Sequence, residues 1–260
     1  MCIRDRAEPV LVFDEFVLRA DKSDSSVVIS SPWNWWLNSG DRLAVMTTNS
    51  FLSYQLMATL SDLVKPVSGE IVQRGTVSWP LGGEGGLDSK LTIDQSLDFL
   101  SNIYSDCLEK SLITLEDFDE VLKTQSIESS SKLKELEKEQ KDYFYMAISI
   151  LFSFDVYLVP KFRYLMSRKA MLLRALFHRQ LEGNSLISTG GNNRFLREFC
   201  NKGMVLNGLG EVIFQGDLEQ AIALVNQNGS DAAEVDSEDD QFDLGDSLKN
   251  ADRDDSTDVL

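Results

Sequence analysis

The stretch GDRLAVMTTNSFLSYQLMATLSDLVKPVSGEI, residues 40–71, decides the expected fold. Within it LAVM is typical of a buried strand, residues 50–63 of a helix, and KPVSGEI of a turn that leads into another strand. A strand, a tight loop and a helix in this order build phosphate-binding loops, because N–H groups at the helix N-terminus point at the ligand. The loop itself, MTTNSFLSYQ, contains neither glycine nor lysine. The sequence thus predicts the frame of a nucleotide site without its usual residues.

The order of the predicted elements indicates an α/β domain over residues 7–228, with a helical subdomain inserted at about 91–152. The expected strands are 11–17, 26–29, LAVM, GTVSWP, DVYLV, SLIS, GMVL and EVIFQG, and the expected helices are 50–63, 91–104, 116–123, 132–152 and LEQAIALVNQ. Trp33, Trp35 and Trp36 fit core packing or cross-strand pairs better than stacking on a base. Residues 161–179 alternate basic and apolar groups, which favours a helix with one basic face over a docking surface for a partner or lipid headgroup.

Charge is concentrated at the C-terminal end. Between residues 231 and 260, twelve acidic residues outnumber two basic ones, so this segment carries −10 of the net charge of −17. Such a composition cannot bury enough apolar surface to fold, and we expect residues 229–260 to be a disordered acidic tail. The chain has no cluster of Lys and Arg, which argues against nucleic acid as a partner.

Cysteine, histidine and apolar patterning exclude several classes of protein. Cys2, Cys107 and Cys200 lie far apart, so we expect three reduced thiols and no metal site. His178 is the single histidine, which disfavours zinc and favours a surface or packing role. The start, MCIRDRAEPV, lacks the apolar core of a signal peptide, and nothing is built on it. The longest apolar run, residues 143–159, contains Asp155 and predicts a buried helix that leads into a buried strand, not a membrane span.

Four stretches of the chain resemble a known family. They are the frame GDRLAVM…LSDLVKPVSGEI, the segment GTVSWPLGGEGGLDSKLT, the segment MAISILFSFDVYLV, and CNKGMVLNGLGEVIFQGDLEQAIALV. The chain resembles the ATP-binding subunits of ABC transporters, and among these the subunits that export capsular or O-antigen polysaccharide. The resemblance implies a P-loop NTPase-like core of the ABC ATPase type, MgATP as ligand, and a membrane permease as partner.

The residues that carry the chemistry of that family are replaced here. The family's phosphate loop reads G-x-x-G-x-G-K-[ST]-[ST], where glycines let N–H groups converge on phosphate, lysine adds charge and a hydroxyl binds Mg²⁺. When the two sequences are aligned, the glycine positions of the motif hold Thr47, Ser50 and Leu52. The lysine position holds Ser53, and the Mg²⁺ position holds Tyr54, followed by Gln55. Asn49 alone matches a common family residue. Without the lysine, the charge of a triphosphate has no partner, and bulky residues do not readily take positive φ.

The same loss recurs at the other motifs. Pro160 stands at the position of the Mg²⁺ carboxylate, and Lys161 at the position of the general base. The signature loop holds Lys138, Glu139 and Gln140. Gly191 stands at the switch histidine, and Asp88 near the glutamine that senses the γ-phosphate. Each replacement removes positioning or charge stabilisation, the main sources of catalysis in phosphoryl transfer.

These observations favour a non-catalytic homologue, a pseudo-ATPase, that needs no cofactor and has no catalytic residue. It would act as a subunit or regulator of a polysaccharide exporter, in the cytoplasm or peripherally at the inner face of the cytoplasmic membrane. It would dock on the permease or on a catalytic sister subunit through the loop GGEGGLDS and the helices within residues 91–122. Two alternatives stay open: an active subunit that binds ATP and Mg²⁺, and a freestanding interaction protein in surface-polysaccharide assembly. Whether the chain forms a dimer also stays open.

Overall fold

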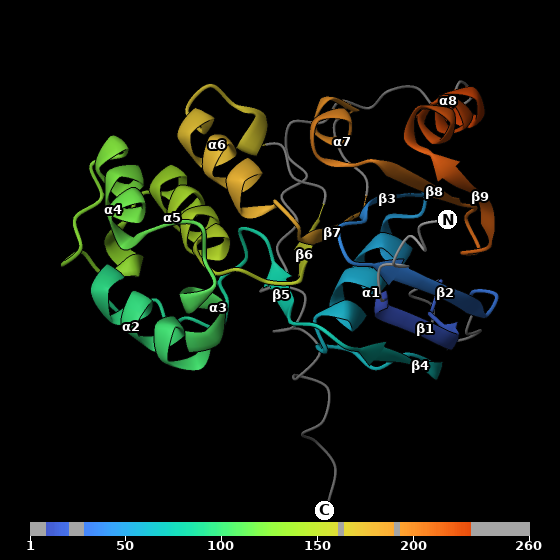
Figure 1. Ribbon diagram of the computed structural model, residues 1–260, viewed down its shortest axis with the longest axis horizontal. Helices are drawn as coiled ribbons and strands as arrows, with labels where there is room; N and C mark the ends of the chain where they lie inside the picture. The colour runs from blue at the N-terminus through green and yellow to red at the C-terminus, as the bar shows by residue number, and fades with distance from the viewer. Residues whose placement is uncertain (1–8, 21–28, 161–163, 190–192, 230–260) are drawn as a thin grey trace, which may run out of the picture.

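The computed structural model describes residues 9–20, 29–160, 164–189 and 193–229. Its centre is a six-stranded sheet in the order β5-β6-β7-β3-β8-β9 (Figure 1). The strands are β3 (Arg42–Met46), β5 (Val77–Pro80), β6 (Val156–Val159), β7 (Ser185–Ser188), β8 (Lys202–Leu206) and β9 (Val212–Asp217). Neighbouring strands run parallel except β9, which is antiparallel to β8. The predicted α/β class is confirmed, and each of these strands was expected from the sequence.

A second, antiparallel sheet has the order β2-β1-β4 and comprises β1 (Pro9–Val17), β2 (Trp33–Asn38) and β4 (Ser68–Gln73). Helix α1 (Ser50–Leu60) packs between the two sheets: its Leu52 and Leu56 share one apolar cluster with Phe13 of β1 and Val45 of β3. In Figure 1 this unit lies at the lower right of the molecule. Packing between two sheets explains why α1 is apolar on nearly all sides.

The other face of the six-stranded sheet is covered by helices α5 (Lys138–Leu151), α6 (Met171–Gln180), α7 (Asn193–Phe199) and α8 (Leu218–Gly229), whose apolar residues join one large core cluster. The expectation for residues 143–159 is confirmed, because they form most of α5 and then β6, and nearly all of them are buried. Among the described residues, no helix combines the length and apolarity that crossing a bilayer requires.

The middle third is helical, as predicted, and forms the group at the left of Figure 1. It contains α2 (Ile93–Ile103), α3 (Ser105–Glu109) and α4 (Leu115–Thr124), and α2 and α4 each begin with a capping box. The expected single helix over 132–152 is wrong. Residues Leu133–Glu135 form a 3₁₀ turn, and α5 starts only at Lys138, because the Leu133 N–H donates to the Leu91 carbonyl and so pairs with a distant segment.

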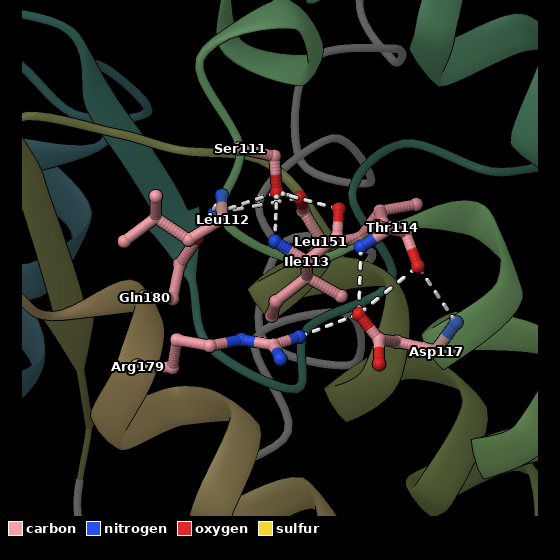
Figure 2. Close-up of polar contacts among 8 residues, drawn as sticks. All are labelled: Ser111, Leu112, Ile113, Thr114, Asp117, Leu151, Arg179 and Gln180. Carbon is pink, nitrogen blue, oxygen red and sulfur yellow. Dashed lines mark hydrogen bonds and ion pairs between the residues drawn. The ribbon is translucent and has the colours of Figure 1, made fainter.

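A buried polar cluster joins this helical group to α6 (Figure 2). Gln180 is fully buried; its Oε1 accepts from the Leu112 N–H (2.9 Å), and its Nε2 donates to Ser111 Oγ (3.1 Å) and to the Leu151 carbonyl (3.4 Å). Arg179, next along α6, forms an ion pair with Asp117 of α4. The N–H of Thr114 and then Arg179 hold the pKa of Asp117 below its usual range. The helical group is therefore fixed to the core by the hydrogen bonds of Gln180 and the Arg179–Asp117 pair as well as by apolar packing.

Several cations within residues 161–179 form ion pairs. Arg174 and His178 both contact Glu198 Oε1, at 3.3 and 2.9 Å, and Lys169 pairs with Glu139. His178 also stacks on Phe199, which confirms its predicted packing role. These cations thus meet carboxylates of the same chain, and the face's lack of a docking role stays a prediction.

The sequence analysis did not predict α3 or α7. The expected strand at 26–29 and the acidic segment 230–260 lie almost wholly outside the described residues, and the domain boundaries remain predictions. Cys107 and Cys200 are buried free thiols, while Cys2 lies outside the described residues.

Candidate functional site

The loop that follows β3 is closed by its own helix. Helix α1 begins at Ser50, and Asn49 is its N-cap: Asn49 Oδ1 accepts from the Leu52 N–H (3.1 Å). The Ser53 N–H donates to the Asn49 carbonyl (3.2 Å). A phosphate-binding loop keeps such N–H groups free for its ligand. Here the N–H groups of Leu52 and Ser53 already have acceptors within the chain.

Asn49 also ties this loop to two distant segments. Its Nδ2 donates to the carbonyls of Ala20 and Gly208, both at 2.8 Å. Thr47 Oγ1 accepts from the Asn49 N–H (3.1 Å) and lies 3.5 Å from the Asn207 carbonyl. The loop is therefore held between the segment after β1 and the turn between β8 and β9.

The side chain of Leu52 fills the space beneath the loop. Leu52 has no exposed surface, and its methyl groups lie against Gly210, where an added Cβ would come within 3.1 Å of Leu52 Cδ2. Gln55 is buried too, Ser50 is exposed, and the Tyr54 ring stacks on Phe51 at 6.5 Å. An apolar side chain thus stands at a position where the resembled motif has glycine, and it forms part of the core cluster.

Parallel strands bring other predicted positions to the same edge of the sheet. Strands β6, β7 and β3 are neighbours, so Pro160, Thr189 and Thr47 follow their carboxyl ends side by side. Pro160 is buried, and a proline side chain has no atom that could bind Mg²⁺. Lys161 and Gly191 lie outside the described residues. Within the part of the chain that the structure describes, no group of three or more His, Cys, Asp or Glu could hold a metal ion.

Lys138, Glu139 and Gln140 form the first turn of α5, and this helix start is already capped. Gln140 Oε1 accepts from the Glu137 N–H (3.2 Å), and Gln140 Nε2 donates to the Gln125 carbonyl (3.0 Å). Glu139 is paired with Lys169. A helix N-terminus attracts anions, but here Glu137 and Glu139 supply that negative charge from the chain itself. A triphosphate would meet two carboxylates.

Asp88 lies in an exposed turn, where its Oδ1 accepts from the Lys90 N–H (2.8 Å). The segment before this turn is held by Ser149, whose Oγ accepts from the Gly82 N–H and from Trp79 Nε1. Asp88 therefore stabilises a surface turn beside the helical group, and this hydrogen bond assigns it no catalytic role.

The three tryptophans of β2 have different surroundings. Trp33 is buried, and its Nε1 donates to the Gly210 carbonyl (2.8 Å), which fits the expected core role. Trp35 packs on Phe13, with ring centroids 5.0 Å apart. Trp36 is 57% exposed and lines a hollow of about 410 Å³ together with Lys202 and Gln215. This hollow lies at the end of the sheet where β3 and β8 begin, away from the loop, and the sequence analysis missed it.

No family model matches the sequence. The chain is 25% identical over 187 residues to the polysialic acid transport ATP-binding protein KpsT of Escherichia coli, a match that covers 71% of this chain and 84% of that protein. It is 23% identical over 171 residues to the capsule polysaccharide export ATP-binding protein CtrD of Neisseria meningitidis serogroup B, covering 65% of this chain and 77% of that protein.

Solved structures agree on the fold. An ATP-binding subunit of an ABC transporter superposes with a TM-score of 0.62 and 16% identity, over 85% of this chain and 95% of that one. A bacterial Atm1-family ABC exporter with ATP bound gives a TM-score of 0.61 and 13% identity, over 99% of this chain and 44% of that one. The chain has the fold of an ABC-transporter ATPase domain, and in sequence it is a homologue of ATP-binding proteins of capsule polysaccharide export.

Proposed function

We propose that this chain is a non-catalytic subunit or regulator of a polysaccharide export transporter. One observation carries the proposal: the loop at the phosphate position is a capped helix start in which the N–H groups of Asn49, Leu52 and Ser53 have acceptors within the chain. Leu52, which stands at a glycine position of the resembled motif, is buried in the core cluster, so this part of the loop is packed as core. Ser53 stands where the resembled motif has its lysine, and Pro160 stands where it has a Mg²⁺ carboxylate. Neither residue supplies the charge of that position.

A protein partner follows from the family. The relatives are named as transport and export ATP-binding proteins, and such a subunit acts with a membrane component. We place the docking surface on the loop GGEGGLDS and helices α2 to α4, and the chain at the inner face of the cytoplasmic membrane. Co-purification with a permease would separate a transporter subunit from the freestanding interaction protein, which needs no membrane partner.

An active ATP-binding subunit is the second candidate. It is favoured by the names of the relatives, which both state ATP binding, and by the fold match to an exporter with ATP bound. This candidate requires MgATP to bind despite the contacts of Asn49 and the burial of Leu52. It also requires residues other than those of the resembled motifs to hold the metal.

Calorimetric titration of the purified chain with MgATP tests the two candidates, with ADP and metal-free ATP as controls. We expect no binding heat up to millimolar nucleotide. A Ser53→Lys variant restores the missing charge, and we expect it to remain silent because the N–H groups of the loop stay occupied. Micromolar binding by the unmodified chain would refute the proposal, and binding by Ser53→Lys alone would show that the loop is open and lacks only charge.

A further inference from the structure

The outer face of the three-stranded sheet carries an apolar row that no described element covers. Val12 of the central strand β1 is paired with Trp36 of β2 on one side and with Val72 of β4 on the other. Paired residues of adjacent strands point to the same face, so the three side chains form a line across the sheet. Trp36 is 57% and Val72 39% exposed, whereas Leu11 and Phe13, which point to the opposite face, are in the core.

Polar side chains flank this row on both sides. On one side Asp14 is paired with Glu70, and Asn34 of β2 bonds to Glu15: its Oδ1 accepts from the Glu15 N–H (3.0 Å) and its Nδ2 donates to Glu15 Oε1 (2.6 Å). On the other side Asn38 ends β2 and Arg74 follows β4. These residues are exposed or half-buried. An indole face is thus set among planar amide, carboxylate and guanidinium groups, which donate and accept hydrogen bonds in defined directions.

The hollow beside Trp36 continues the polar surface. Asp41 Oδ1 pairs with Lys202 Nζ (2.7 Å), and Asp41 Oδ2 accepts from the Asn38 N–H (3.2 Å) and from Asn38 Nδ2 (3.3 Å). The exposed Gln215 of β9 completes the far wall. The polar groups at the bottom of the hollow are therefore held in place before any ligand arrives, which lowers the cost of binding.

We propose that this face and the hollow beside it bind a neutral carbohydrate chain. A pyranose ring has an apolar C–H face, which suits Trp36 and its two valines, and a rim of hydroxyl groups, which suits the amides and carboxylates around them. Asp14 and Glu70, which are paired and exposed on this face, oppose an anionic polymer. A protein partner fits less well, because a stable interface covers about 800 Å² per partner with several large anchors, and this row has one. The choice of a polymer over a free sugar rests on the proposed function.

Electrophoresis in native gels that contain dextran, yeast mannan or arabinogalactan tests the assignment, with polysialic acid as the anionic comparison. We expect retardation of the full chain by at least one neutral polymer and none by polysialic acid. Trp36→Ala should weaken the apparent affinity about tenfold, as expected for the loss of one stacked ring. Val72→Lys should weaken it as well. Phe99→Ala, which removes another exposed aromatic ring (44% exposed) from α2, should leave the apparent affinity unchanged.

Circular dichroism and the urea midpoint establish that each variant is folded before its mobility is compared. No retardation by any neutral polymer, equal retardation of Trp36→Ala, or stronger retardation by polysialic acid would overturn the assignment. A change in oligomeric state of Trp36→Ala in sedimentation, without a change in mobility, would identify the face as a protein contact. Retardation by a chain that also hydrolyses MgATP would leave this inference standing and refute the proposed function, so the two can fail separately.

Discussion

Replacing Asn49 by alanine is expected to destabilise the fold through three lost hydrogen bonds. The helix cap to the Leu52 N–H contributes about 1 kcal/mol. Each of the two bonds from Nδ2 to the carbonyls of Ala20 and Gly208 contributes about 0.5–1.5 kcal/mol, at the low end because this corner is half exposed. The free energy of unfolding should therefore fall by about 2 kcal/mol.

Urea unfolding followed by circular dichroism measures this loss. With a slope of about 2 kcal/mol/M, the midpoint should move down by about 1 M. Asn49→Asp keeps the acceptor of the helix cap but removes the Nδ2 donor. Its stability loss therefore measures the two bonds to the Ala20 and Gly208 carbonyls apart from the cap. Asn102→Ala is the matched control, because Asn102 makes one exposed bond within α2 and should change stability by less than about 0.5 kcal/mol. If the urea midpoint of Asn49→Ala moves no further than that of Asn102→Ala, the Asn49 side chain does not hold the loop. The loop could then open to receive a nucleotide.

Three further predictions concern the core. Gly203→Ala should cost about 1–3 kcal/mol, because its Cβ would lie 2.4 Å from the Cβ of Ala221, and adding Ala221→Gly should recover part of that loss in thermal unfolding. Gln180→Ala should cost about 2–4 kcal/mol by leaving the Leu112 N–H without a partner, and a loss below about 1 kcal/mol would contradict the assigned bond. Burial raises the pKa of Tyr145 to about 12, so the unfolded chain ionises first and stability should fall as the pH rises from about 10 to 12. The difference between urea midpoints at pH 9 and pH 11 should be smaller in Tyr145→Phe, and an unchanged difference would refute this cause.

A nucleotide-binding loop can lose its charged residues alone, or it can also lose the backbone shape that receives the phosphates. A site that lacks only its charged residues could still accept a nucleotide weakly, because its backbone would keep the receptive shape. In this chain the N–H groups of Leu52 and Ser53 bond to Asn49, and the Leu52 side chain is buried in the core. Restoring chemistry would therefore require changes in packing as well as in charge.

Local periodicity was sufficient for most elements. LAVM, DVYLV and GMVL are short apolar runs next to turn signals, and they form strands β3, β6 and β8 of the central sheet, because buried parallel strands need no polar face. The segment before Lys138 departs from its helical pattern because its backbone bonds to Leu91, more than forty residues earlier in the chain. Short helices such as α7 carry too few turns for a periodic signal.

The sequence by itself predicted an α/β fold with a helical insert, and a register in which the residues of the resembled nucleotide motifs are replaced. It could not say what the replacements do, because their partners are distant: Leu52 is covered by Gly210, and Asn49 is held by Ala20 and Gly208. The same holds for Trp36, whose exposure depends on which strands flank β2 and on what covers the outer face of that sheet. Propensity and periodicity act between neighbours in the chain, whereas the closing of a loop and the exposure of a face are set by long-range packing.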